Sequence, residues 1–329
     1  MNNPPASIGA SIDEIDTPAL IVDLDAFESN LAKLSDFART AGVRLRPHAK
    51  THKCPVIALK QIAAGAVGQC CQKVGEAEAL VRGGVRDVLV SNQVVGAHKL
   101  RRLAALARDA RIGLCFDSAE QVDAAARAAS EIGVVFDALV EIDVGMARCG
   151  VAPGEPAAVL AAHIAAAPGL ACEVVSGAGT GTFRLECAAG VWTELQAGSY
   201  LFMDTDYARI GNPDGGRYTE FRHSLFVLAS VMSVPTADRA VVDAGLKSTS
   251  GERGMPWVHG RDDIEDASLS DEHAKLILGP KAQRVRLGDK VKLIPGHCDP
   301  TINLHDWFVA VRGDRVEALW PIAARGASH

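Results

Sequence analysis

Short β-branched runs alternate with alanine-rich stretches of helical periodicity through the first two thirds of the 329-residue chain. This order of elements is typical of βα units around a parallel sheet. The helical stretches mostly end at glycine, which favours helix C-termini. We therefore predict an α/β fold with a (β/α)8 TIM-type barrel. The predicted strands are VRLRPHA from 43, AVGQCCQ from 66, DVLVSNQ from 87, IGLCFD from 112, DALVEIDV from 137, CEVVSGAG from 172 and TELQAGS from 193.

The last third of the chain shows strands and turns but almost no helical periodicity. Its apolar runs are FRHSLFVLASVMSV, DRAVVDAGL, GDKVKLIPGH and DWFVAVRGDRVEALWPI. We expect a C-terminal all-β domain that the N-terminal strand ALIVDLD at 19–25 joins. The predicted domains are a barrel at 24–224 and a β domain formed by 1–23 and 225–329.

Composition narrows the class of partner. The chain is 48% hydrophobic and 22% charged, with a formal net charge of -6 and no long run of one sign. These values give no reason to expect nucleic acid or an anionic membrane as partner, so a small molecule is expected. The N-terminal residues lack the pattern of a signal peptide, and we expect a cytoplasmic protein. The eight cysteines form no CxxC pair, so most are expected to be reduced and buried.

Lys50 follows the first predicted barrel strand, in the phrase LRPHAKTHKCP. Barrel enzymes keep catalytic residues at the carboxyl ends of their strands, and a lysine there can form a Schiff base. A basic surface loop explains the same phrase, because it also contains Arg46, His48, His52 and Lys53. The phrase alone does not separate the two interpretations.

Two glycine-containing loops follow the last two predicted strands. They are SGAGTGT at 176–182 and QAGSY at 196–200. Glycines let backbone N–H groups approach an anion, and barrels commonly bind phosphate after their seventh and eighth strands. Either loop alone would be a flexible turn, but together they predict a phosphate site.

The segment EIDVGMARCGV ends a predicted strand with Asp143 and Arg148. An arginine beside a cofactor ring can donate a hydrogen bond without losing its charge. A surface salt bridge is the alternative interpretation.

The phrase PGHCDPT places His297, Cys298 and Asp299 in one predicted extended turn. His and Asp two residues apart can then face the same side and bind a divalent cation. A polar turn is the alternative interpretation.

Together, DTPALIVDLDAFESN, LRPHAKTHK, SGAGTGTF, TELQAGSYLFMD and PGHCDPT closely resemble the D-threonine aldolase and D-serine dehydratase family, which has the alanine racemase type of fold. The resemblance implies that Lys50 holds pyridoxal 5'-phosphate, that Arg148 contacts its ring and that His297 and Asp299 bind a metal. It also implies a homodimer. Asp299 favours the aldolase branch and Mn²⁺, with Mg²⁺, Co²⁺ or Zn²⁺ as alternatives. The phosphate-binding residues it implies are Gly179, Thr180, Gly198 and Ser199.

One βα unit of the barrel is missing from the pattern, because PAAVLAAHIAAAPGL runs directly into ACEVVSG. The resemblance implies a strand there that ends in a Tyr-His-Gly-like phrase. We expect the join near Leu170 to Cys172 to be either a break in the chain or the mark of a deleted unit.

The sequence therefore predicts a carbon–carbon lyase that cleaves D-β-hydroxy-α-amino acids to glycine and an aldehyde. A dehydratase acting on D-serine or D-3-hydroxyaspartate at the same site is the first alternative. A non-catalytic protein that binds pyridoxal phosphate is the second.

Overall fold

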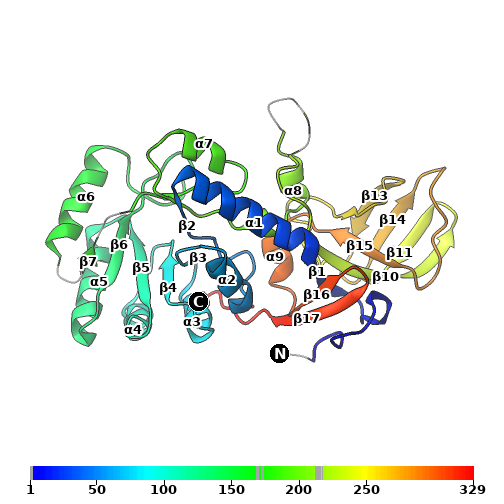
Figure 1. Cartoon of the computed structure of the whole chain (residues 1–329), viewed down its shortest axis with the longest axis horizontal. Coiled ribbons are helices and arrows are strands. Elements are labelled where there is room, and N and C mark those ends of the chain that lie inside the picture. Colours follow the sequence, from blue (N-terminus) through cyan, green and yellow to red (C-terminus); the bar gives the residue numbers. More distant parts are fainter. Residues whose placement is uncertain (1–2, 168–169, 172–173, 212–215, 217) are drawn as a thin grey trace. The chain divides into compact units, whose positions relative to one another are not determined.

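The computed structural model describes residues 3–167, 170–171, 174–211, 216 and 218–329. The chain forms two compact units (Figure 1). Unit 1 comprises Met1–Phe37 and Gly198–Arg325, and unit 2 comprises Ala38–Ala197 and Gly326–His329. The predicted domain boundaries at residues 24 and 224 stay a prediction.

Unit 2 contains two parallel sheets. Five pair in the order β3-β4-β5-β6-β7, and three pair in the order β2-β9-β8. A parallel bridge between His48 and Cys70 joins the two sheets. Each of the seven predicted runs contains a strand. The bounds are β2 Arg44–Leu45, β3 Gln69–Cys71, β4 Asp87–Val90, β5 Arg111–Phe116, β6 Phe136–Val140, β7 Leu170–Ala171, β8 Ser176–Gly177 and β9 Glu194–Leu195.

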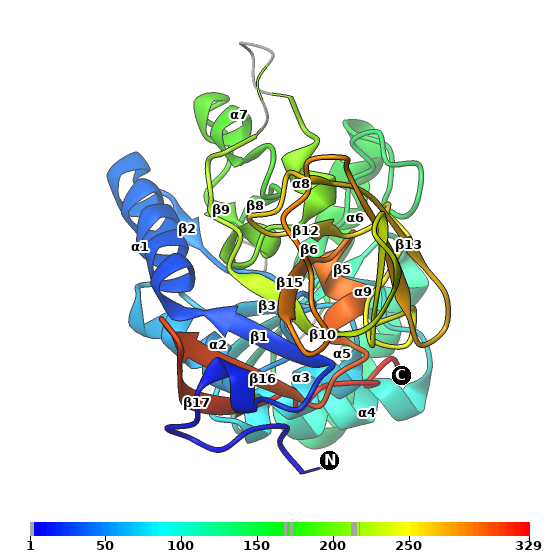
Figure 2. The same ribbon diagram turned by 90° about the vertical axis from the view of Figure 1, so that its right-hand side faces the viewer.

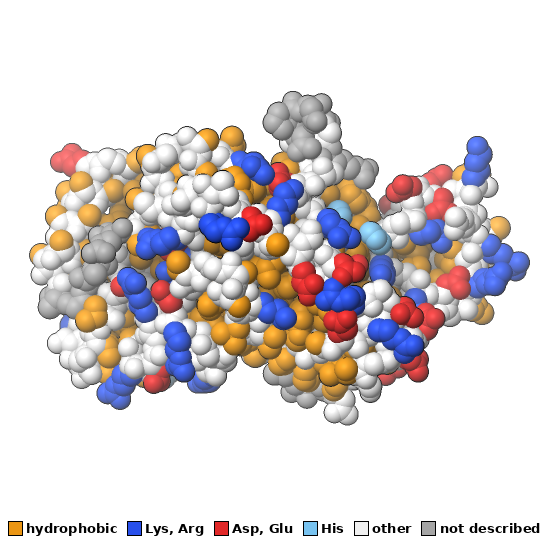
Figure 3. Space-filling view, viewed as in Figure 1, with side chains coloured by type: hydrophobic (Ala, Val, Ile, Leu, Met, Phe, Trp, Pro, Cys, Tyr) orange, Lys and Arg blue, Asp and Glu red, His pale blue; other side chains and the backbone are white. Residues whose placement is uncertain are grey.

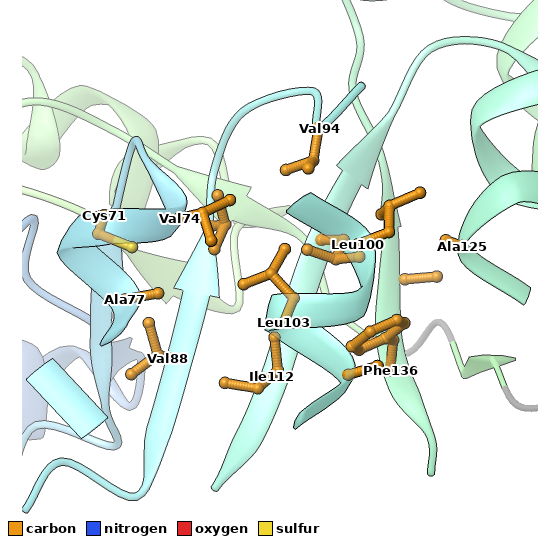
Figure 4. Close-up of a cluster of buried hydrophobic side chains, with 14 of the residues drawn as sticks. Cys71, Val74, Ala77, Val88, Val94, Leu100, Leu103, Ile112, Ala125 and Phe136 are labelled. Carbon is orange, nitrogen blue, oxygen red and sulfur yellow. The ribbon is translucent and has the colours of Figure 1, made fainter. Parts of the chain in front are cut away.

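Helices cover the outer face of these strands, as the barrel prediction requires (Figures 1 and 4). The helix with the clearest sequence signals is α5, where the Ser118 hydroxyl accepts the Gln121 N–H and Gly133 ends the helix at φ 73°. The bounds are α2 Pro55–Ala63, α3 Val74–Arg82, α4 Ala97–Leu106, α5 Ala119–Ile132, α6 Glu155–Ala166 and α7 Phe183–Ala188.

Side chains of β3–β6 alternate between two faces. Outward-facing residues such as Val88, Ile112 and Phe136 pack with the helices in one core (Figure 4). Residues at the intervening positions form a second, smaller cluster of Cys70, Leu89, Cys115 and Leu139, one from each strand. This second cluster is a layer of the barrel interior.

The barrel is interrupted between β7 and β8. Strand β7 pairs with β6, strand β8 pairs with β9, and the described residues contain no pair between β7 and β8. Only residues 172–175 separate these two strands. Parallel neighbours need a crossover of a dozen or more residues, so β7 and β8 cannot be consecutive barrel strands. Cys172 lies outside the described residues, but Ala171 pairs directly beside Asp137, which favours a deleted unit.

Unit 1 contains the predicted β domain. Its sheet order is β13-β14-β11-β10-β1-β16-β17, and β15 pairs with both β10 and β12. Strand β1 lies between β10, antiparallel, and β16, parallel (Figure 2), so the N-terminal strand joins the domain as predicted. The strand bounds are β1 Ala19–Asp23, β10 Leu225–Thr236, β11 Arg239–Val242, β12 Trp257–Val258, β13 Ile264–Leu269, β14 Ala274–Leu278, β15 Lys290–Ile294, β16 Trp307–Arg312 and β17 Arg315–Pro321.

One long helix and several short helical segments accompany the sheet of unit 1. The long helix α1 begins directly after β1, and Phe27 on it contacts Phe202 and Trp320. The bounds are η1 Ile12–Glu14, α1 Leu24–Ala41, η2 Ser199–Leu201, α8 Thr205–Ala208 and α9 Cys298–Ile302.

The described cysteines are reduced and the surface carries mixed charges, as the composition predicts. All seven described cysteines are free of disulfides, and five of them are buried. The face drawn in Figure 3 mixes cationic and anionic side chains without one large field of either sign. Across the described residues, no helix is both long and apolar enough to cross a membrane.

Candidate active site

Lys50 lies in a turn at residues 49–52, a few residues after β2 ends at Leu45. Two lysines of this turn differ in their contacts. The Lys53 ammonium forms an ion pair with the buried carboxylate of Glu76. The Lys50 ammonium makes neither a hydrogen bond nor an ion pair within the described part of the chain. Lys50 is therefore the amine in this turn that is available for chemistry.

His48 lies two residues before Lys50 and is buried. Its Nδ1 accepts the Lys50 backbone N–H at 3.4 Å, and its Nε2 lies 3.2 Å from Ser91 Oγ. Burial lowers the pKa of His48 well below its usual value, and the charges of Lys50 and Arg148 lower it further. His48 is therefore neutral at physiological pH, and both cations lie near enough to act on it.

Arg148 lies in the loop that follows β6 and is exposed. Asp143 of the same loop accepts the N–H groups of Gly145 and Ala147, and these bonds lower the pKa of its carboxyl group. Asp143 is thus used by its own loop. Arg148 forms no ion pair within the described residues.

The loop after β8 has a tight backbone. Ala178 adopts φ 74°, and the Gly179 N–H donates to Thr182 Oγ1 at 3.2 Å. A Cβ atom on Gly179 would meet only Thr182 Oγ1, at 3.8 Å, so the loop is open on that side. Thr180 is 1% exposed. Gly179 and Thr180 therefore share one loop, as the sequence predicts.

The second glycine loop, with Gly198 and Ser199, begins unit 1. Tyr207 hydrogen-bonds the Ser199 side chain, while burial raises the pKa of the tyrosine to about 12. Asp204 is fully buried and accepts the Cys298 N–H at 2.9 Å. Burial raises the pKa of this carboxyl group. Asp204 thus connects the segment His297–Asp299, the HCD motif, to the segment that carries Ser199.

The HCD segment differs from its prediction. His297 is extended, but α9 begins at Cys298 and includes Asp299, so the segment is not one extended turn. Thr301 Oγ1 donates to the His297 carbonyl at 2.8 Å, and Pro300 occupies the first turn of the helix, where it is well tolerated.

His297 is oriented by a carboxylate. Glu252 Oε2 lies 2.9 Å from His297 Nδ1, and this contact lowers the pKa of Glu252. A histidine that donates from Nδ1 to a carboxylate leaves Nε2 as a metal ligand. The described residues contain no group of three His, Cys, Asp or Glu side chains placed to hold a metal. His297 and Asp299 would therefore need water or substrate oxygens to complete a coordination shell.

Sequence reasoning missed the residues that support the site. His48 appeared only as part of a basic phrase, and Asp204, Tyr207 and Glu252 carried no motif signal. His48, Asp204 and Glu252 act by contacting residues distant in sequence, such as Ser91 for His48 and Cys298 for Asp204.

Comparison with known proteins gives the family. Residues 22–177 match the alanine racemase N-terminal domain, and residues 224–311 match a putative serine dehydratase domain. A D-threonine aldolase of Arthrobacter sp is 43% identical over 370 residues, which cover 99% of this chain and 97% of the relative. The chain belongs to the D-threonine aldolase family. The 3-hydroxy-D-aspartate aldolase of Paracoccus denitrificans, a carbon–carbon lyase by name, is 41% identical over 373 residues, covering 99% and 96%.

Solved structures agree on the fold. The crystal structure of D-threonine aldolase from Filomicrobium marinum matches with a TM-score of 0.95 and 43% identity, covering both chains fully. A D-threo-3-hydroxyaspartate dehydratase of Delftia sp. is more distant, at 29% identity over 93% of this chain and 97% of the relative. One structure of that dehydratase, at 25% identity and a TM-score of 0.75, is a cysteine mutant in the metal-free form; it covers 95% of this chain and 98% of that chain.

The aldolase family also explains the interrupted barrel. The alignment with the Arthrobacter aldolase runs over 370 positions, 41 more than the 329 residues of this chain. An excess of that size matches one βα unit with its crossover. The alignment therefore contains positions that this chain does not fill, and the expectation of a deleted unit between β7 and β8 stays a prediction.

Proposed function

We propose that the chain is a pyridoxal phosphate- and divalent metal-dependent lyase that cleaves D-β-hydroxy-α-amino acids to glycine and an aldehyde. The observation that carries the proposal is the unpaired ammonium of Lys50 at the carboxyl end of β2, beside neutral His48 and in a turn whose other lysine is held by Glu76. Family membership supports the reaction class.

The residues of unit 2 suit the cofactor. Lys50 would hold it covalently, and the unpaired guanidinium of Arg148 would donate to its ring. Gly179 and Thr180 would bind its phosphate from one loop, and the family resemblance assigns Gly198 and Ser199 to the same group. Bound pyridoxal phosphate would supply an electron sink for the bonds at the substrate α-carbon.

The metal site is proposed at His297 and Asp299. Glu252 would hold the imidazole so that Nε2 faces the ion, and Asp299 would add one carboxylate oxygen. This donor pair suits Mn²⁺ best, with Mg²⁺, Co²⁺ or Zn²⁺ as alternatives. A bound cation would lower the proton affinity of the substrate β-hydroxyl. The metal-free cysteine mutant of the dehydratase supports a metal role in this family.

Product analysis tests the reaction. Purified protein with pyridoxal phosphate and Mn²⁺ should release glycine and an aldehyde from D-threonine or D-3-hydroxyaspartate, the two substrates that the names of the relatives suggest. Release of a 2-oxo acid and ammonia would instead show the dehydratase alternative. Cofactor uptake without turnover, even with metal present, would show the non-catalytic alternative.

Metal dependence is tested separately. His297→Ala or Asp299→Ala should remove metal-dependent turnover and leave cofactor uptake unchanged, because neither residue is assigned a cofactor contact. Asp314→Ala is the matched control, since this carboxylate is exposed in the turn between β16 and β17. Full activity after chelation would contradict the metal role.

The homodimer and the cytoplasmic location also stay proposals. Light scattering of the active protein tests the first, since a fully active monomer would exclude it. Cell fractionation tests the second.

A further inference from the structure

His48 makes contacts that no step of the proposed reaction uses. We propose that His48 is the positioning residue for Lys50, because it ties the turn that carries this lysine to the carboxyl ends of β3 and β4. The contacts are the Lys50 N–H at 3.4 Å from Nδ1, and Gln72 Nε2 and Ser91 Oγ at 2.9 and 3.2 Å from Nε2. The inference rests on the proposed role of Lys50.

The hydrogen-bond directions are consistent with a neutral ring. Since Nδ1 accepts the Lys50 N–H, Nε2 carries the ring proton and donates to Ser91 Oγ. Ser91 Oγ in turn donates to the Cys71 carbonyl at 3.3 Å. One chain of hydrogen bonds therefore leads from the Lys50 backbone across the ends of three neighbouring strands. The Gln72 amide suits the same ring with its oxygen toward Nε2, where it accepts the ring proton.

The charges around the ring keep Nδ1 available as an acceptor. Lys50, His52, Lys53 and Arg148 all act against a second proton on His48, and burial acts most strongly. The nearby carboxylate, Glu76, is occupied by Lys53 and by the Gln72 N–H. In a protonated ring, Nδ1 carries a hydrogen and cannot accept the Lys50 N–H. Neutrality is therefore part of the positioning role.

The same phrase supplies a matched control. His52 is also buried, and its Nδ1 also accepts the N–H of the residue two positions later, Cys54, at 3.1 Å. The other ring nitrogen of His52 contacts Gln61 on α2, at 3.2 Å. Its ring thus supports a helix start rather than the Lys50 turn. Replacing His52 should affect stability without affecting Lys50.

The test compares His48→Asn, His48→Gln, Ser91→Ala and His52→Asn in the full chain. Asparagine can place its amide oxygen near the position of Nδ1, so it keeps an acceptor for Lys50. Glutamine reaches the position of Nε2 but leaves the Lys50 N–H without its partner. We would measure pyridoxal phosphate affinity by absorbance, the fraction that borohydride fixes to the protein, and the melting temperature.

We expect His48→Gln to weaken cofactor affinity about threefold to tenfold, the range for loss of one neutral hydrogen bond. Ser91→Ala and His48→Asn both lose the contact at Nε2 but keep an acceptor for the Lys50 N–H, so each should show a smaller loss of about twofold to threefold. His52→Asn should lower the melting temperature alone. Borohydride fixing in the unaltered protein and in His48→Asn should follow the same pH profile, since the ring does not titrate.

Three results would overturn the inference. The first is a His48→Gln protein that loses stability like His52→Asn but binds the cofactor normally. The second, if His48→Gln does not fold, is unchanged affinity in Ser91→Ala. The third is a pH profile whose inflection near 6.5 disappears in His48→Asn, which would show a titrating ring. If the unaltered protein itself fixes no cofactor at Lys50, the proposed function fails, and this inference fails with it.

Discussion

The two sides of the barrel in unit 2 differ in how completely they are built. Strands β4 to β6 are four to six residues long and share one core with their helices. Strands β7 to β9 are two residues each. Large apolar side chains around the interruption are 48% to 75% exposed: Val144, Met146, Val159, Val175, Leu185 and Val191. Parallel strands are stable when neighbours and helices cover them, so a missing βα unit would leave short strands and exposed side chains of this kind.

The proposed chemistry is divided between these sides. Lys50 and His48 follow β2, which pairs with β9, but the side-chain contacts of His48 lie just after β3 and β4. The loop with Gly179 and Thr180 follows β8, and Arg148 lies in the loop after β6, beside the interruption. We call the strands β3 to β6 with their helices the complete side of the barrel, and the strands β7 to β9 the interrupted side. Covalent attachment of the cofactor should depend on the complete side, whereas full turnover should depend on both sides.

Lys50→Ala is expected to have the largest effect. It should reduce borohydride-fixed cofactor to background, because it removes the proposed attachment point, and it should leave stability unchanged. Lys53→Ala is the matched control: it breaks the buried ion pair with Glu76, so it should lower the free energy of unfolding by about 2 kcal/mol and still fix the cofactor. Wild-type fixing in Lys50→Ala, measured by absorbance and mass spectrometry, would show that the attachment point lies elsewhere.

Inserting the missing unit should have the next largest effect. A chimera that carries the βα segment of the Paracoccus aldolase between Ala171 and Ser176 should cover the exposed side chains around the interruption. We expect a higher free energy of unfolding, because the insert would bury apolar side chains that are now exposed. Urea unfolding measures it. Turnover should rise with it, whereas the fraction of cofactor fixed at Lys50 should change little.

A scrambled insert of the same length is the control. If both inserts leave stability and turnover unchanged, the interruption is not the place where the barrel lacks its unit.

The sequence predicted the barrel and its gap because both depend on local patterns. β-Branched runs, helix caps such as Ser118 and Gly133, and the short link after Ala171 are readable one segment at a time. Strand β13 was missed because only Ala267 in it is buried, which leaves no alternation. In β14, the exposed Ile277 adds an apolar residue to the outer face and obscures the alternation in the same way.

The candidate site was predictable only in part. Lys50, Arg148 and the glycine loops stand in recognisable phrases. Supporting contacts, such as Asp204 with Cys298, join residues 94 positions apart and leave no periodic signal.

Arg46 connects the two sides and allows an intermediate test. Its guanidinium forms ion pairs with Asp87 on β4 and with Glu194 on β9, whose side chain is 1% exposed. Arg46→Met should lower the free energy of unfolding by about 3 kcal/mol, because Glu194 would stay buried without its main partner. Arg111→Met breaks a pair with Asp137 that is 58% exposed at the arginine, so it should cost about 1 kcal/mol or less. Equal costs in urea titrations would contradict a buried link between the two sides.

The smallest expected effect is a pH dependence on the complete side. His48 has a folded-state pKa well below the ordinary value of 6.5, so below pH 6.5 the unfolded chain binds a proton that the folded chain does not. Stability is therefore full above that pH and falls as the pH falls, by at most about 1.4 kcal/mol per pH unit for one proton. His305, buried in unit 1 with its pKa also lowered by burial, should add to the slope. In urea unfolding from pH 7 to 5, His48→Asn should remove the contribution of His48 to the slope of stability against pH. The inserted βα unit should leave this contribution unchanged, because the contacts of His48 lie on the complete side. A slope that is the same with and without the imidazole would mean that His48 is not the neutral, buried group on which the positioning of Lys50 depends.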